Sequence, residues 1–338
     1  MADNPIFRAR RASWLVRGIG TLIALYVGIV LALMWWWSYE SAQFDVVKFA
    51  QARAAAHQQQ VVVGSVVTGA LIGSGETLLD KRGGYLSNDK LPPGVLMDNV
   101  PNWEFGVLTA TRDLAREMRN KFARSQSQSE EDLDLKEADP LFSSPNDRWL
   151  LPSSEGQYRK AIDHVEGYLV RLGKNDPNGA QFYARADNLA DYLDLVSTRL
   201  GSLSQRLSAS VGQIQLQGDA PVDPNAPVAA TKSPQVVRTP WNKIDDIFYE
   251  SRGYTWALLE QLKAVEVDFG PTLERKNAMV SLKQVIRELE ESQKPVMSPM
   301  ILNGSPFGFF ANHSLVMANY VSRANAAIID LKSLLNRG

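Results

Sequence analysis

Residues 18–37 read GIGTLIALYVGIVLALMWWW, an uninterrupted run of twenty residues without a charged side chain. An α-helix rises about 1.5 Å per residue, so this run would be about 30 Å long, the thickness of the hydrocarbon core of a bilayer. A helix is required there because lipid offers no partner to an unpaired backbone amide or carbonyl group. The run therefore predicts a single N-terminal transmembrane helix, and the rest of the chain is placed relative to it.

Aromatic and basic residues mark both ends of this run. Four arginines precede it, whereas Glu40 and Asp45 follow it. By the positive-inside rule, residues 1–13 form a cytoplasmic tail, residues 14–39 cross the bacterial inner membrane, and the body lies in the periplasm. The side chains expected at the two lipid–water interfaces are Trp14, Arg17, Trp35, Trp36, Trp37 and Tyr39.

The apolar segments allow two other interpretations, a cleaved secretory signal and a second membrane span. A cleaved secretory signal has an apolar region of about 7–15 residues that ends in small residues, whereas this run is longer and ends in three tryptophans. Residues 61–75 (VVVGSVVTGALIGSG) are also uncharged and offer a second possible span. They are short and rich in small polar residues, so a buried or partner-facing helix is the favoured interpretation.

Composition excludes several classes of function. The four arginines and Asp3 at the N-terminus leave 32 of the 36 basic and 36 of the 37 acidic residues in the rest of the chain. A mildly acidic body is poorly suited to neutralise phosphates, so we expect no nucleic-acid partner. The chain has no cysteine, which excludes disulfides, thiol catalysis and thiolate metal sites.

The segment after the anchor is expected to be mainly helical. It contains no proline before Pro92, so the anchor is predicted to continue as helix through residues 44–60. Residues 40–124 would form a juxtamembrane helical region with an ordered glycine- and proline-rich loop at 81–106 and a helix at 107–124. Residues 125–147 are polar and acidic, which is typical of a mobile segment.

The C-terminal half is expected to contain two helical units. Residues 148–214 would form a helical hairpin, with helices at 154–172 and 182–207. Residues 215–240 would be a proline- and alanine-rich linker to a C-terminal helical unit at 241–338, with helices at 241–267, 273–292 and 312–336. The fold class is therefore mainly α, a transmembrane helix followed by a helical periplasmic body with long ordered loops.

The helix at 182–207 has the clearest periodicity in the chain. Its apolar residues alternate spacings of four and three, as in the a and d positions of a coiled coil: Phe182, Ala186, Leu189, Leu193, Val196, Leu200, Leu203 and Leu207. Packing against neighbouring helices of the same chain is the favoured explanation. An intermolecular coiled coil is the alternative.

Two aromatic loops are the candidate partner or ligand surface. The first contains Trp103 and Phe105. The second places three phenylalanines before a helix that Asn312 or Ser314 would cap, and its candidate residues are Phe307, Phe309, Phe310 and His313. The three histidines of the chain are far apart in sequence, and no nucleophile, phosphate-binding or zinc-protease motif occurs. We therefore predict no catalytic residues, cofactor or metal.

Several long strings give the chain a family resemblance. Residues 77–108 read TLLDKRGGYLSNDKLPPGVLMDNVPNWEFGVL, and residues 298–331 read SPMILNGSPFGFFANHSLVMANYVSRANAAIIDL. Residues 122–135, 181–193 and 198–212 add FARSQSQSEEDLDL, QFYARADNLADYL and TRLGSLSQRLSASVG. Together they resemble the proteobacterial family catalogued as domain of unknown function 2333. The resemblance implies an inner-membrane protein of a Gram-negative bacterium and supplies no catalytic residues.

These observations favour a non-enzymatic cell-envelope protein, a scaffold that binds another envelope protein or associates with itself. The alternative is an envelope enzyme or ligand-binding protein that acts on lipid or cell-wall material, with a site where residues 83–105 and 303–313 meet. A membrane sensor is a third hypothesis, but a tail of 13 residues is too short to hold an output domain.

Overall fold

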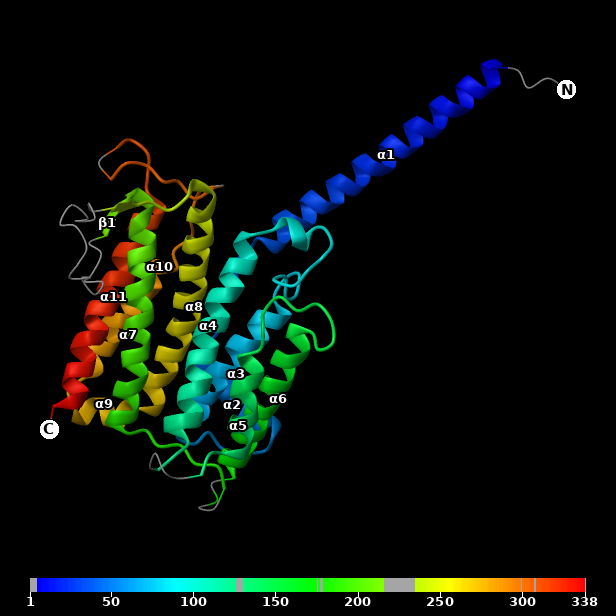
Figure 1. Cartoon of the computed structure of the whole chain (residues 1–338). Helices are drawn as coiled ribbons and strands as arrows, with labels where there is room; N and C mark the ends of the chain where they lie inside the picture. Colours follow the sequence, from blue (N-terminus) through cyan, green and yellow to red (C-terminus); the bar gives the residue numbers. More distant parts are fainter. Residues whose placement is uncertain are drawn as a thin grey trace, which may run out of the picture.

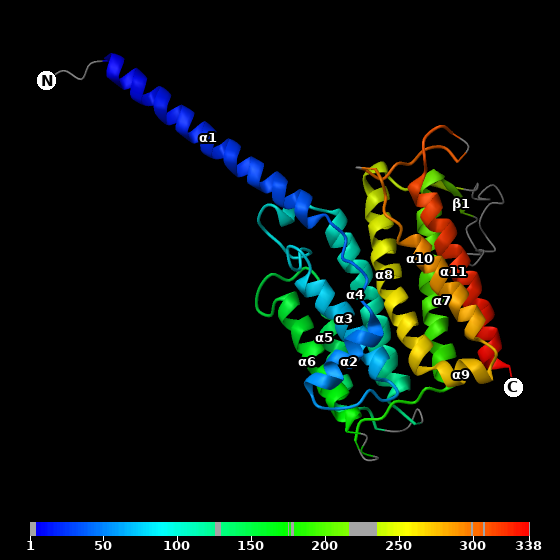
Figure 2. The same ribbon diagram turned by 180° about the vertical axis from the view of Figure 1, so that it is seen from behind.

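The computed structural model describes residues 5–125, 130–174, 176, 179–215, 235–298, 300–306 and 308–337. Within these residues the protein is a helical body from which one long helix, α1 (Pro5–Trp37), projects (Figures 1 and 2). Among the described helices, one contains a candidate membrane span, Val16–Trp37, with a mean hydropathy of 2.1 and almost no burial against the body. The predicted mainly helical fold with an N-terminal apolar helix is confirmed.

The chain does not continue as helix beyond the anchor. Residues 38–45 form an extended segment, and α2 (Val46–Ala56) starts a new helix. The Asp45 carboxylate accepts hydrogen bonds from the backbone amides of Val47 at 3.1 Å and Lys48 at 3.0 Å. The predicted continuation through residues 44–60 is therefore wrong, because Asp45 caps the second helix instead of lying inside the first.

Residues 61–75 contribute to a buried helix. The helix α3 (Ser65–Asp80) is covered by α2, α4 (Asn99–Glu117), α6 (Ser154–Gly173) and α8 (Ile244–Asp268). Its small residues allow this close packing, as at Gly73, where an added Cβ would lie 2.5 Å from the Phe44 ring. In the structure this run is part of a buried helix, which was the favoured interpretation.

The segment predicted to be polar and mobile, 125–147, contains a helix. After α4, a π-helical turn (Met118–Phe122) leads into the loop before α5 (Leu133–Phe142), which packs on α6. Leu135, Ala138 and Phe142 are buried. The prediction failed because the acidic composition hid a short stripe of apolar residues at helical spacing.

The heptad residues are buried within their own chain. The helix α7 (Ala186–Ser208) packs along α11 (His313–Asn336), and Leu193, Val196 and Leu200 are fully buried. Packing on neighbours of the same chain therefore accounts for the pattern. α6 instead packs on α3 and α5, so residues 148–214 do not form the predicted hairpin.

The C-terminal part is more divided than predicted. It contains a 3-10 turn (Trp241–Lys243), α8, α9 (Gly270–Arg275), α10 (Met279–Ser292) and α11. A turn at Asn277, whose φ is 51°, separates α9 from α10, where the sequence predicted one helix. A short antiparallel pair, β1 (Gln213–Gln215) and β2 (Gln235–Val237), borders the predicted linker at 215–240, most of which lies outside the described residues.

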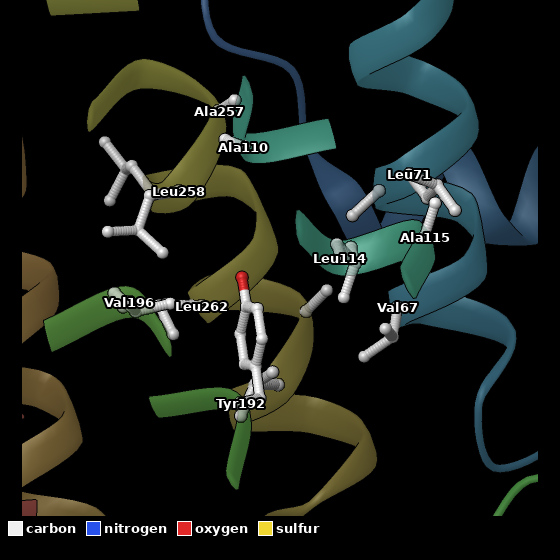
Figure 3. Close-up of a cluster of buried hydrophobic side chains, with 14 of the residues drawn as sticks. Val67, Leu71, Ala110, Leu114, Ala115, Tyr192, Val196, Ala257, Leu258 and Leu262 are labelled. Carbon is white, nitrogen blue, oxygen red and sulfur yellow. The ribbon is translucent and has the colours of Figure 1, made fainter. Parts of the chain in front are cut away.

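The helices α4 and α8 form the centre of the body. They approach so closely that a Cβ added at Gly106 would lie 2.1 Å from the Glu250 carbonyl oxygen, and one added at Gly253 would lie 2.0 Å from that of Trp103. Figure 3 shows Ala110 of α4 beside Ala257 of α8 in the same contact. One turn after another, small residues therefore let the two backbones touch, and the other helices pack around this pair.

Replacing Gly253 with alanine tests the central contact. A Cβ there meets backbone atoms that cannot rotate away, so we expect the free energy of unfolding to fall by about 2 kcal/mol or more. The matched control is Gly201→Ala on α7, where the nearest atom to the added Cβ is 3.7 Å away. That control should be neutral or stabilising by up to about 1 kcal/mol. Chemical denaturation followed by tryptophan fluorescence measures both, and equal effects would contradict the close contact.

Candidate functional site: the junction of anchor and body

The end of α1 and the segment after it lie against the body and form a pocket there. The pocket combines the ends of α3, α4 and α8 with the chain that leaves the anchor. Its lining residues are Trp37, Ser38, Tyr39, Glu40, Ser41, Lys81, Asn99, Val100, Trp103 and Tyr249. The first five of these belong to the anchor or to the residues directly after it, so the pocket exists only while the anchor contacts the body.

Trp37 packs on a glycine that no other residue can replace without rearrangement. A Cβ added at Gly83 would lie 2.7 Å from Cδ2 of the Trp37 ring, and Gly83 has a φ of +84°, which favours glycine. Beside this contact, the Arg82 guanidinium lies 5.2 Å from the centre of the Tyr39 ring, a cation–π geometry. The loop after α3 thus receives the last aromatic residues of the anchor.

A buried arginine fixes the first acidic residue after the anchor. Arg252 of α8 is 1% exposed, and its Nε lies 2.6 Å from Oε1 of Glu40. Its Nη2 donates to Oε2 of Glu40 at 2.7 Å and to the carbonyl oxygen of Gln293 at 3.0 Å, and its Nη1 donates to the Ser292 carbonyl oxygen at 3.1 Å. One guanidinium therefore joins the anchor exit, α8 and the end of α10.

A second buried ion pair holds the loop that Trp37 contacts. The Lys81 ammonium pairs with the Glu104 carboxylate and also donates to the Gly84 carbonyl oxygen. Glu104, fully buried on α4, accepts hydrogen bonds from the backbone amides of Leu86 and Ser87, both at 2.8 Å. Because the Lys81 ammonium is committed to these acceptors, it serves as a structural tie and is not a free nucleophile.

Two buried carboxyl groups lie deeper along α8. Neither oxygen of Glu260 has a hydrogen bond of good geometry, and burial raises the pKa of this carboxyl to about 7, although Lys263 and the Phe44 backbone amide act to lower it. Asp268 accepts a 2.7 Å hydrogen bond from the backbone amide of Val67, at the start of α3. Burial raises the pKa of Asp268 to about 6, although hydrogen bonds from the backbone amides of Val67, Gly64 and Val66 act to lower it. Glu260 is thus the less well satisfied of the two.

The structure separates the aromatic residues predicted to form a partner surface. Trp103 is buried on α4 with its ring 5.4 Å from that of Trp256, and it lines the junction pocket, away from the other aromatic residues. Phe105 is partly exposed in a groove between α4, α7 and α8. Phe309 and Phe310 are exposed and lie edge to face, 5.7 Å apart, whereas Phe307 lies outside the described residues.

His313 closes the loop that precedes α11. Its Nδ1 accepts a hydrogen bond from the Leu302 amide at 3.0 Å, and burial lowers its pKa. Asn312 caps α11 by accepting from the Leu315 amide at 2.9 Å, as one of the two predicted caps. His313 thus stabilises the loop, whose described residues line neither the junction pocket nor the groove beside Phe105.

Most of the predicted membrane-interface residues are exposed, and two of them also contact the body. Trp14, Arg17, Trp35, Trp36 and Tyr39 are exposed, as interfacial residues of an isolated span would be. Trp37 and Tyr39 also line the junction pocket. The residues that sequence reasoning missed are Glu40, Lys81, Glu104 and Arg252, because ion pairs between distant segments leave no periodic signal. Arg252 gave no signal either, because Glu250 lies two residues before it and Ser251 and Gly253 flank it, as in an ordinary polar stretch.

The ionisable groups of the body mostly tie helices together. Within the described residues no group of three or more metal-ligating side chains occurs. His57 lies 2.9 Å from the Glu166 carboxylate, and His164 lies 3.3 Å from that of Asp134. Each of these pairs joins helices or loops far apart in sequence, which is the role of interhelical ion pairs.

Fold and site together define a mainly helical protein whose single described apolar span, at the N-terminus, contacts the body at its C-terminal end. Residues 8–338 match DUF2333, a family described as an uncharacterized protein conserved in bacteria. The match covers nearly the whole chain, so the protein belongs to this family, as the resemblance of its sequence indicated. No curated protein and no solved structure matches the chain.

Removing the charge of Glu40 tests the junction. In Glu40→Gln the buried Arg252 keeps its charge without a counter-ion, so we expect a loss of about 2 kcal/mol in the free energy of unfolding, less than for a fully buried pair because Glu40 is partly exposed. The control is Glu291→Gln, whose exposed pair with Lys294 should contribute no more than about 0.5 kcal/mol. Urea denaturation in detergent measures both. If the two variants lose the same stability, the junction pair is not structural.

Glu260 should make stability depend on pH. Its pKa is raised in the folded state, so the folded protein holds a proton that the unfolded chain has released, and stability falls as pH rises from about 4.5 to about 7. Over this pH range the raised pKa changes the free energy of unfolding by about 3 kcal/mol. Glu260→Gln should abolish this pH dependence, most visibly between about pH 6 and pH 7. Asp268→Asn, as the comparison variant, should flatten only the lower part, below about pH 6. Denaturation midpoints against pH provide the measurement, and an unchanged slope above pH 6 would contradict the assignment.

Proposed function

We propose that this protein is a membrane-anchored periplasmic scaffold that presents a rigid helical body to another component of the bacterial cell envelope. The observation that carries the proposal is the junction, where Glu40 pairs with Arg252 and Trp37 packs on Gly83. A protein that needed only to be kept near a membrane would be served by a flexible tether. A fixed junction instead orients the body relative to the bilayer.

The direction of insertion is argued from charge. The arginines before the span and the acidic residues after it favour a cytoplasmic N-terminus and a periplasmic body in the inner membrane. The exposed tryptophans at both ends of the span fit the two headgroup layers. Membership of a bacterial family is compatible with this location.

The distribution of ionisable groups favours a binding role over catalysis. Arg199 pairs with Asp113 through two contacts of 2.9 and 3.1 Å, and Arg206 pairs with Glu250 across the same groove. Together with the lysine of the junction, these groups are committed to contacts between helices. A reactive site needs a nucleophile or base aimed at substrate, whereas the charged groups that line the two pockets pair with other residues of the body.

A ligand-binding or enzymatic role on lipid or cell-wall material is the second candidate. The junction pocket favours it, because the pocket lies directly after the span, where lipid headgroups would be, and is partly aromatic. Val100→Phe would fill part of this pocket while keeping all four residues of the two ion pairs unchanged. Loss of the cellular function in this variant, with fold and protein contacts retained, would support the ligand over the scaffold.

In-cell crosslinking tests the scaffold. With a photo-crosslinking residue at the exposed Val280, we expect specific envelope proteins, or a second copy of the chain, to be captured. Glu40→Gln should reduce this capture because it loosens the orientation of the body, whereas the control Glu291→Gln should not. Capture that is unspecific, or equal in both variants, would refute an oriented scaffold.

Reporter fusions test the orientation separately. Alkaline phosphatase fused after Gly338 should be active, because it folds only when exported, and a fluorescent cytoplasmic reporter at the same position should be dark. The opposite pair of results would place the body in the cytoplasm.

A further inference from the structure

The chain connections lie at two opposite ends of the helical body. At the end where α1 leaves, they comprise residues 81–98, 143–153 and 238–243 and the described part of 293–312, which we call the anchor-side face (Figures 1 and 2). At the opposite end they comprise 57–64, the described part of 118–132, 269–278 and the turn before α7. Every long helix of the body runs between these two ends.

Hydrogen bonds join the anchor-side loops to one another and to the anchor. The Tyr85 hydroxyl donates to the Asn146 carbonyl oxygen at 2.9 Å, and the Asn88 amide donates to that of Arg148 at 2.8 Å. Asn303 donates to the Ser210 carbonyl oxygen at 3.0 Å. Arg252 binds both Glu40 and the start of the 293–312 loop. The face is therefore one continuous surface around the exit of α1.

Large apolar side chains protrude from this face. The most exposed of them are Leu91, Leu151, Trp241, Met297, Phe309 and Phe310, between 69% and 98% exposed. At the opposite end, the described connections expose Val61 and Val63, and the helix ends beside them expose Leu133, Val267 and Val280 but no aromatic side chain. Such an accumulation on one face of a folded body costs solubility and marks a contact surface.

The charge of the face fits an anionic partner. The four segments contain seven basic and three acidic residues. Lys81 is buried against Glu104, and Lys243 and Lys294 pair with Asp246 and Glu291. The basic residues that remain exposed on the face are Arg82, Lys90, Arg148 and Arg238. Apolar and aromatic side chains interspersed with basic ones are the chemistry that binds the headgroup layer of a phospholipid bilayer. The anchor already holds this face next to such a layer, so even weak contacts form at high effective concentration.

We propose that the anchor-side face rests on the membrane that α1 spans, with the protruding apolar side chains among the lipid headgroups. This inference depends on the membrane anchoring of the proposed function and adds a second, peripheral contact to it. Residues 143–153 and the described part of 293–312 would then contact the bilayer surface at a distance from the anchor. Together with the junction they fix the tilt of the body.

The test uses the full chain with single cysteines, which is clean because the natural sequence has none. Each variant carries an environment-sensitive fluorophore and is reconstituted in vesicles of phosphatidylethanolamine and phosphatidylglycerol that contain lipids with a nitroxide at the headgroup end of the chain. Leu151→Cys and Phe309→Cys probe the face, Leu133→Cys and Val280→Cys are equally exposed controls elsewhere, and Leu25→Cys reports on α1. Because the probed side chains are exposed, these substitutions leave the fold intact.

The expected result is blue-shifted emission and loss of fluorescence by lipid quenching at positions 151 and 309, but not at 133 and 280. If position 25 enters lipid while 151 and 309 behave like the controls, the peripheral contact is refuted and the anchor stands. If position 25 itself remains in water, the anchoring fails, and the membrane-resting face fails with it. A protein partner on this face would also give unquenched probes and so would overturn the inference.

Discussion

The architecture depends on one buried guanidinium. Arg252 is removed from water in the middle of a helical core, where an unpaired charge would cost several kcal/mol. The structure satisfies it by bringing Glu40 from the end of the anchor and two backbone carbonyl groups from the end of α10. Because the guanidinium needs these partners together, folding of the body selects one position for the chain that leaves the apolar helix α1. The anchor is thereby part of the fold.

The same junction depends on the close contact of α4 and α8. Gly106 and Gly253 let the two helices touch, and this sets the positions of Glu104 on α4 and Arg252 on α8. Glu104 then ties the loop that receives Trp37, whereas Arg252 ties Glu40, three residues further along the chain. One ion pair thus acts on Trp37 through the loop at Gly83, and the other acts directly on Glu40, so a shift of either helix is transmitted to the anchor exit.

The sequence predicted what periodicity and length encode. The uncharged run at 18–37, the heptad leucines of α7 and the Asn312 cap of α11 each follow from local spacing, and the helices formed there. It missed features set by partners elsewhere. The chain breaks after Trp37 because Glu40 is drawn to α8, and Trp103 became a core residue because α8 offers Gly253 and Trp256 opposite it. Propensity near residue 40 favoured a helix, and tertiary contacts overrode it.

A single transmembrane helix leaves the body free to tilt and to rotate about its axis, which makes a binding surface on that body inefficient. A rigid junction removes rotation relative to the helix, but not the tilt of the helix in the bilayer. Tilt is restrained only by contacts away from the helix axis, and the loops at 143–153 and 293–312 provide them if they reach the headgroups. The Arg252–Glu40 pair and the protruding Leu151 and Phe309 then act together. The fixed junction keeps the distance between the anchor and the loops constant. Because that distance is constant, weak contacts of the loops with the bilayer surface determine the orientation of the whole body.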